Sequence, residues 1–130
     1  MPTPEKIPVR LMEDLHTATI GRCAYGTQFM LNEFTDGSTE VVILYHFDSD
    51  GNYLRHKLAQ TNQTNAEAAK SKLMDNIKDH ELCDISVRPF EISVDGKVYG
   101  LVVSPNGESV NLQPHSQISF MEPWDGEYYT

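Results

Sequence analysis

The histidines are the side chains of this sequence best suited to acid–base chemistry, because imidazole titrates near neutral pH. The chain has five: His16, His46, His56, His80 and His115. None forms an HxH, HxxxH or HxxE pair, the spacings that place metal ligands side by side, so we predict no metal site. His56 is our candidate for a general base if it lies in a cleft, and otherwise it is a core or rim histidine.

The cysteines and the acidic segment Asp48–Asn52 carry no catalytic or metal-binding motif. Cys23 and Cys83 lie outside any glycine-rich nucleophile turn, and Cys83 follows a predicted helix, whose dipole disfavours a thiolate. Counted from Asp48, glycine is at the fourth position and Ala59 at the twelfth, whereas a calcium loop of EF-hand type needs glycine at the sixth and glutamate at the twelfth. We therefore expect reduced thiols, a plain turn, no catalytic residue and no cofactor.

Two groups of aromatic residues are candidate binding sites. Trp and Tyr are enriched at interface hot spots, so we assign partner binding to the aromatic and acidic C-terminal segment, unless its aromatic rings fold back and close one end of the core. Its candidate residues are Trp124, Asp125, Glu127, Tyr128 and Tyr129. The second group is expected to line a small-ligand cleft between the sheet and the helix or C-terminal segment, and comprises Tyr45, His56 and Tyr99.

The net charge of −9 argues against a nucleic-acid partner, since a polyanion repels such a surface unless basic side chains cluster strongly. The one tight basic group is Arg55, His56 and Lys57, which alternates across a predicted strand. An acidic surface favours a basic protein partner instead. We find no signal peptide and no apolar run of about 18 residues, and expect a cytoplasmic protein without membrane contact.

Glycine-containing turns predict the elements that position these residues. Five of the eight glycines follow Asp or Asn, the strongest short-range hairpin signal, because both central residues of such a turn take positive φ. These dipeptides are Asp36-Gly37, Asp50-Gly51, Asp95-Gly96, Asn106-Gly107 and Asp125-Gly126.

Two hairpins follow from these turns. Glu40–Phe47 and Tyr53–Leu58 flank the first, and Asp84–Val94 and Lys97–Ser104 flank the second. Two-residue loops predict the pairs Phe47 with Leu54, Tyr45 with His56, Ile43 with Leu58, Ile92 with Tyr99, and Phe90 with Leu101. Pro89 has no N–H to give to a ladder, so we expect a bulge or bend there.

The long interval without an Asx-Gly turn contains one predicted helix, at about 65–78. Thr64 and Glu67 have the spacing of a capping box. One helical stripe holds the apolar residues Ala66, Ala69, Leu73, Met74 and Ile77. The prediction is therefore an α+β fold, with a mostly antiparallel sheet of six to eight strands, one helix packed on it, and a single domain over residues 1–130.

Landmarks occur along nearly the whole chain, and the strongest are Val87-Arg88-Pro89-Phe90 and the ending Glu122-Pro123-Trp124-Asp125-Gly126. In these landmarks the chain resembles a family of small bacterial proteins often labelled formate hydrogenlyase regulatory protein-like. The resemblance implies a standalone bacterial domain of this β-rich type, and it brings no catalytic residues.

These observations favour an accessory or regulatory protein that acts by contact with another protein, without catalysis. One alternative is a small-ligand-binding protein or minor hydrolase that uses the cleft described above. Another is an acidic, immunity-type neutraliser of a basic toxin, which the charge permits. A homodimer is a further alternative, because an uncovered edge strand can pair with the same strand of a second copy.

Overall fold

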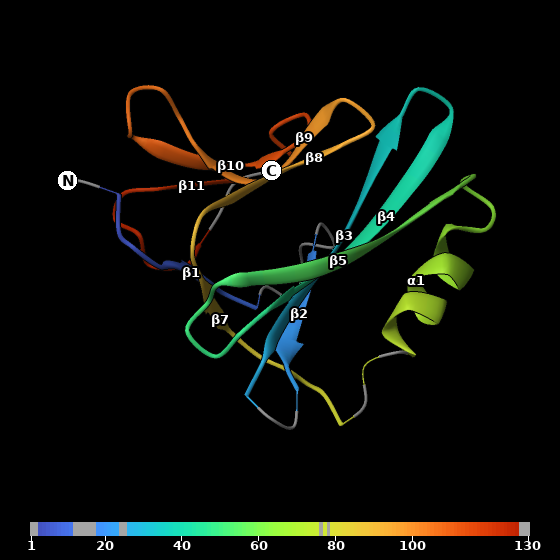
Figure 1. Cartoon of the computed structure of the whole chain (residues 1–130), viewed down its shortest axis with the longest axis horizontal. Coiled ribbons are helices and arrows are strands. Elements are labelled where there is room, and N and C mark those ends of the chain that lie inside the picture. The colour runs from blue at the N-terminus through green and yellow to red at the C-terminus, as the bar shows by residue number, and fades with distance from the viewer. Residues whose placement is uncertain (1–2, 12–17, 24–25, 76, 78, 128–130) are drawn as a thin grey trace.

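A computed structural model describes residues 3–11, 18–23, 26–75, 77 and 79–127 (Figure 1). Within these ranges the chain forms three antiparallel sheets, with eleven strands, and one helix. The predicted α+β class and the mostly antiparallel pairing are confirmed. The predicted single sheet of six to eight strands is wrong, because the strands divide among three sheets.

The largest sheet has five strands in the order β5-β4-β3-β2-β6. Its strands are β2 (Ala18–Arg22), β3 (Gln28–Asp36), β4 (Thr39–Phe47), β5 (Tyr53–Thr61) and β6 (Glu81–Leu82). From Val41 to Phe47 every residue of β4 is buried, as expected of a central strand covered on both faces.

The remaining strands form two smaller sheets. The four-stranded sheet has the order β11-β10-β9-β8, and the two-stranded sheet pairs β1 with β7. Their bounds are β1 (Ile7–Val9), β7 (Ile85–Val87), β8 (Phe90–Val94), β9 (Lys97–Val103), β10 (Ser109–Gln113) and β11 (Ser119–Met121).

Pro89 explains why the strands divide between sheets. The sequence predicts a bulge or bend within one strand, Asp84–Val94, whereas the structure ends β7 at Val87 and begins β8 at Phe90. Strand β7 pairs with β1, and β8 pairs with β9. Since proline has no N–H for a ladder, the chain leaves one sheet here and enters another.

The hairpin at Asp95-Gly96 has the predicted register. Asp95 and Gly96 have φ values of 50° and 81°, so both take the positive φ that this turn requires. The pairs are Ile92 with Tyr99 and Phe90 with Leu101, as predicted.

The hairpin at Asp50-Gly51 differs from the prediction at its tip. Tyr45 pairs with His56 and Ile43 with Leu58 as predicted, but Phe47 pairs with Tyr53 instead of Leu54. One oxygen of the Asp48 carboxylate accepts the backbone N–H groups of Asp50 and Asn52, which makes the loop longer than two residues. The resulting irregularity in the ladder leaves Leu54 45% exposed.

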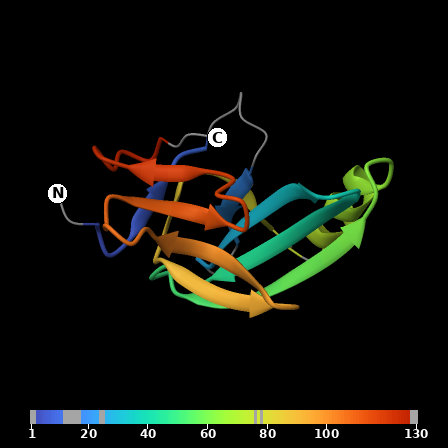
Figure 2. The ribbon, with the colours of Figure 1, turned by 90° about the horizontal axis from the view of Figure 1, so that it is seen from above.

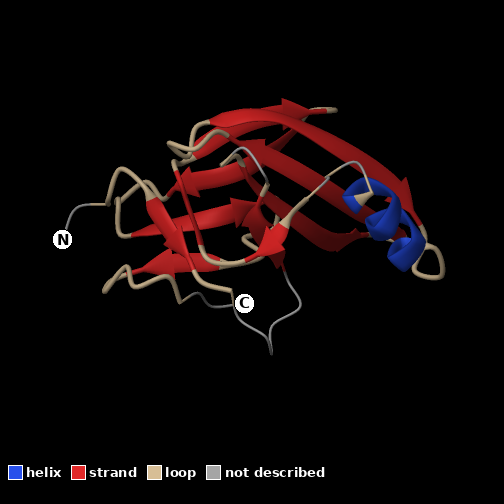
Figure 3. Cartoon of the chain, turned by 90° about the horizontal axis from the view of Figure 1, so that it is seen from below, coloured by secondary structure: helices blue, strands red, loops and turns tan. Residues whose placement is uncertain are grey.

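The five-stranded sheet lies between the four-stranded sheet and the helix (Figures 1 and 3). On β4, the odd-numbered residues from Val41 to Phe47 face the smaller sheets and join the larger hydrophobic cluster. The even-numbered Val42 and Leu44 face the helix, with Phe29, Leu31, Leu73 and Ile77. Figure 2 shows the two larger sheets from above.

The helix α1 spans Ala66–Met74, so it is shorter than the predicted 65–78. Its N-cap is Asn65, which makes no side-chain capping hydrogen bond, so the predicted capping box from Thr64 is wrong. Four of the five residues predicted for the apolar stripe lie on the helix as expected, since Ala66 and Leu73 are buried and Ala69 and Met74 are partly buried against the sheet. The fifth, Ile77, is buried in the same cluster but follows the end of the helix.

Candidate functional site

Tyr45 and His56 lie on the face of the five-stranded sheet that is turned toward the smaller sheets, and Tyr99, on β9 of the four-stranded sheet, packs into the same cluster. Tyr45 pairs with His56 across β4 and β5, and Tyr45 and Tyr99 belong to the cluster between the sheets. With exposures of 0% and 3%, the two tyrosines are core residues. They do not line a cleft between the sheet and the helix, because the helix covers the opposite face.

The Tyr45 hydroxyl has no hydrogen-bond partner among the described residues. Burial, reinforced by the nearby Tyr99 and Tyr53, raises the pKa of Tyr45 far above its ordinary value. The phenol therefore stays neutral at physiological pH and is unsuited to proton transfer.

His56 is half-buried at the rim of the same core. Its Nδ1 lies 2.7 Å from the Tyr53 hydroxyl, and the Tyr53 ring stacks on Phe90 at 5.0 Å between centroids. The sequence left two interpretations of His56, a general base in a cleft or a core or rim histidine. This hydrogen bond and the packing of Tyr53 favour the rim histidine.

The acidic segment after β4 forms a turn. Both oxygens of the Asp48 carboxylate accept hydrogen bonds, from the backbone of Asp50 and Asn52 and from the Asn52 side chain. These bonds, the Asn52 contributions first, hold the pKa of Asp48 below its ordinary value. Over the described part of the chain, no three His, Cys, Asp or Glu residues converge as a metal site would require. Cys23 and Cys83 are free, partly buried thiols.

The C-terminal segment Glu122–Glu127 returns to the start of the chain. Trp124 is half-buried and packs against the cluster between the sheets. The backbone N–H of Arg10 donates to the Gly126 carbonyl at 2.9 Å, and the Arg10 guanidinium lies 3.0 Å from the Glu127 carboxylate. Asp125 and Glu127 are exposed. Tyr128 and Tyr129 lie outside the described residues.

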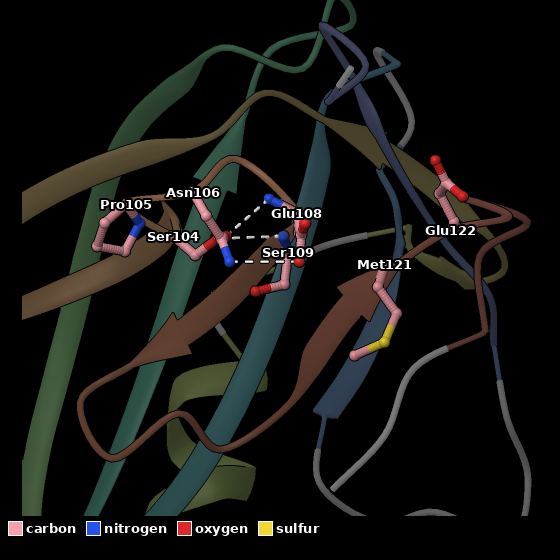
Figure 4. A pocket seen from close by; sticks show the side chains of 7 residues that line it. All are labelled: Ser104, Pro105, Asn106, Glu108, Ser109, Met121 and Glu122. Carbon is pink, nitrogen blue, oxygen red and sulfur yellow. Dashed lines mark hydrogen bonds between the residues drawn. The ribbon is translucent and has the colours of Figure 1, made fainter. Parts of the chain in front are cut away.

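A pocket of about 660 Å³ lies between the β9–β10 turn and the start of this segment (Figure 4). We call it the acidic pocket. The turn lines it with Ser104, Pro105, Asn106, Glu108 and Ser109, and Met121 and Glu122 line its other side. Sequence reasoning missed it, because the Asn106-Gly107 signal predicts the turn but not its proximity to Met121.

Hydrogen bonds within the turn fix the wall of the acidic pocket. Ser104 Oγ donates to Asn106 Oδ1 at 2.6 Å, and the same oxygen accepts the backbone N–H of Glu108 at 3.0 Å. The apolar surface beside the turn includes Met121, which is 38% exposed. With the Glu108 carboxylate on the turn and Glu122 at the far edge of the pocket (Figure 4), the lining combines negative charge with an apolar contact, which suits a basic side chain that has an aliphatic stem.

A second hollow of about 530 Å³ lies between β5 and α1. We call it the helix groove. It is a sheet–helix cleft of the kind that the sequence predicted, but Lys57 and Lys72 line it in place of Tyr45, His56 and Tyr99.

Comparison with family models, with curated proteins and with solved structures gives no match for this chain. Among the described residues, no helix has the length and apolar character needed to cross a membrane.

Proposed function

We propose that this chain is a non-catalytic accessory or regulatory protein that acts by contact with a basic partner protein. The observation that carries the proposal is the acidic pocket, where the exposed Met121 lies among lining residues that include Glu108 and Glu122. A lysine or arginine of a partner fits this lining, since its stem packs on Met121 while its head pairs with carboxylate.

The charge of the whole chain supports the same kind of partner. A net charge of −9 attracts a basic protein over a distance of about one Debye length and raises the association rate. The exposed Asp125 extends the acidic surface along the C-terminal segment, which includes the residues that the sequence assigns to partner binding, whereas the exposed Glu127 pairs with Arg10.

Within this proposal, the partner-binding segment retains Trp124 as its packed anchor and Asp125 and Glu127 as its exposed charges. A basic toxin is one partner of the required chemistry. The proposal also includes three expectations from the sequence: a bacterial origin, a cytoplasmic location and membership of the family that the chain resembles.

Site-specific photo-crosslinking in the cells that make the protein tests this function. We would place p-benzoylphenylalanine at position 121 and, as a matched control, at position 98, where Val98 is an exposed apolar residue of β9. We expect a discrete adduct with one basic protein from position 121. Its yield should fall about tenfold in the Glu108→Gln, Glu122→Gln double variant, because both carboxylates are removed.

Two results would contradict the proposal. One is the same set of adducts from positions 121 and 98, which would indicate unspecific collisions. The other is an adduct from position 121 whose yield is unchanged when both carboxylates are neutralised, which would remove the electrostatic basis of recognition.

A further inference from the structure

The helix groove lies on the other side of the molecule from the acidic pocket. Figure 1 shows α1 and the β9–β10 turn at opposite ends of the chain's longest dimension. The groove's volume of about 530 Å³ falls within the range of about 300–1,000 Å³ that is usual for small-molecule sites.

Small side chains create the groove. Leu73 and Ala66 are buried, and Leu73 belongs to the cluster over β3 and β4, so the helix packs there most closely. Over β5, Ala59 faces Ala69 of the helix, and both line the groove. Larger residues at these two positions would fill the space, so the apolar floor is open because both are alanine.

The two lysines lie at the same end of the groove. Strand β5 and helix α1 follow one another through a short loop, so Thr61 and Asn65 line the loop end. Lys57 lies about 13 Å from that end along the strand, at about 3.3 Å per residue. Lys72 lies about 11 Å from it along the helix, at about 1.5 Å per residue. The backbone positions of both lysines therefore lie toward the end away from the loop, and Ala59 and Ala69 line the groove with them.

The local charge on this face is positive although the chain is acidic. Arg55 and Lys57 have no ion-pair partner among the described residues. Two acidic groups of the helix face, Glu33 and Glu67, pair with Lys70.

Buried His46 lies close enough to this face for its charges to act on it. Desolvation first, and then the charges of Arg55 and Lys57, lower the pKa of His46 below its ordinary value. An anion at Lys57 would complete a charge arrangement that the described residues leave uncompensated.

We propose that the helix groove binds a small organic acid, whose anionic head contacts Lys57 and Lys72 and whose short apolar body lies on Ala59, Ala69 and Leu73. The groove is about as long as seven helical residues and is bounded by the β5–α1 loop. The groove's volume is in the range of small-molecule sites, and the charge of Lys57, which no described residue pairs, favours an anionic head. The inference is independent of the acidic pocket and of its protein partner.

Titration of the purified full chain with four hexyl compounds tests the proposal. The probes are hexanoate, hexyl phosphate, neutral hexanol and cationic hexylammonium, followed by calorimetry and by the methyl NMR signals of Ala59, Ala69 and Leu73. We expect one or both anions to bind in this groove, and hexanol and hexylammonium to bind at least about tenfold more weakly, because they lack the charge that the lysines recognise. Whether hexanoate or hexyl phosphate binds with the higher affinity distinguishes a carboxylate ligand from a phosphate ligand.

Variants of the groove separate specific binding from general attraction. Lys57→Gln and Lys72→Gln should each weaken the anion about tenfold, Lys57→Arg should retain most of the affinity, and Lys6→Gln, outside the groove, should leave it unchanged. Ala69→Leu should block binding by filling the floor while the lysines remain.

Four outcomes would overturn the proposal. Three are no methyl shift with either anion, equal binding of hexylammonium, and anion binding that Lys57→Gln leaves unchanged. The fourth is binding of an acidic helical peptide at least tenfold tighter than both hexyl anions, which would assign the groove to a protein segment instead. None of these outcomes bears on the crosslink at position 121, so the two proposals stand or fall separately.

Discussion

The hydroxyl group of Tyr45 lies between the sheets, where no described residue forms a hydrogen bond with it. A buried polar group without a partner costs free energy that an apolar group of the same shape would not. The packing around Tyr45 therefore uses the aromatic ring and does not need the hydroxyl.

Removal of that hydroxyl should not destabilise the protein. For Tyr45→Phe we expect a free energy of unfolding that is unchanged or higher by up to about 1 kcal/mol, measured by urea denaturation. The control is Tyr53→Phe, which loses the 2.7 Å hydrogen bond to His56 and should cost about 0.5–1.5 kcal/mol. A loss of more than about 2 kcal/mol from Tyr45→Phe would mean that the hydroxyl has a partner, such as a buried water.

The difference in the free energy of unfolding between the Tyr45→Phe variant and the parent protein should grow at high pH. Because the pKa of Tyr45 is raised in the folded state, the folded protein keeps a proton that the unfolded chain loses above about pH 10. Stability then falls as the pH rises through that range, and Tyr45→Phe should lessen the fall. Urea denaturation of both proteins at pH values on either side of about 10 measures the difference.

At the scale of elements, the register predicted from the sequence was most accurate where the backbone conformation of the two turn residues alone sets it. Asp95-Gly96 closes the predicted two-residue loop, because the positive φ of both residues fixes the register of the flanking strands. Asp50-Gly51 has the same residue types, yet Asp48 draws the chain into a longer loop, so the first predicted pair is displaced. Side-chain hydrogen bonds to the turn decided that difference.

Glycine has different importance in these two turns. Gly51 has a φ of 88°, and a Cβ there would lie 2.7 Å from the Ser86 carbonyl oxygen and 2.9 Å from Val87 Cα. Gly96 has a φ of 81°, and nothing lies within 4 Å of the position that a Cβ would take there. The Gly51 turn also packs on β7, since its carbonyl accepts the Arg88 N–H at 2.8 Å.

A matched pair of alanine variants measures this difference. Gly96→Ala should cost about 1–2 kcal/mol, the strain of alanine at positive φ. Gly51→Ala should cost at least about 1 kcal/mol more, because the new methyl group meets backbone atoms of β7 that have no room to move. Thermal and urea unfolding of the two variants provide the comparison, and equal losses would contradict the packing of the Asp50-Gly51 turn on β7.

At the scale of the whole molecule, Gln28 joins two of the sheets. Its side chain is 1% exposed, and its amide nitrogen donates to the carbonyls of Asp48 and Ser86 at 3.1 and 2.9 Å. Its Oε1 accepts the Ser86 N–H at 2.8 Å. One side chain on β3 thus holds the Asp48 turn and strand β7 together, a role that nothing in the sequence around Gln28 indicates.

Loss of this amide should weaken the whole fold. For Gln28→Ala we expect a decrease of about 2–4 kcal/mol in the free energy of unfolding, because the partly buried N–H and carbonyl of Ser86 lose their partners and a buried side chain is truncated. Gln60→Ala, at an exposed position of β5, is the control and should change the free energy by less than about 0.5 kcal/mol. A cost for Gln28→Ala as small as that of the control would show that the sheets hold together without it.

The sequence by itself determined features that neighbouring residues decide: the register of the Asp95-Gly96 hairpin, the positions of the β3–β4, β4–β5 and β9–β10 turns, and one helix with an apolar face. The tertiary structure decided how those elements combine. Pro89 ends the pairing of strand β7, but it does not determine which strand β8 pairs with. It also assembled the acidic pocket from Ser109 and Met121, and the helix groove from Lys57 and Lys72. Those residues meet only because packing brings together strands, turns and a helix that are separate in the chain.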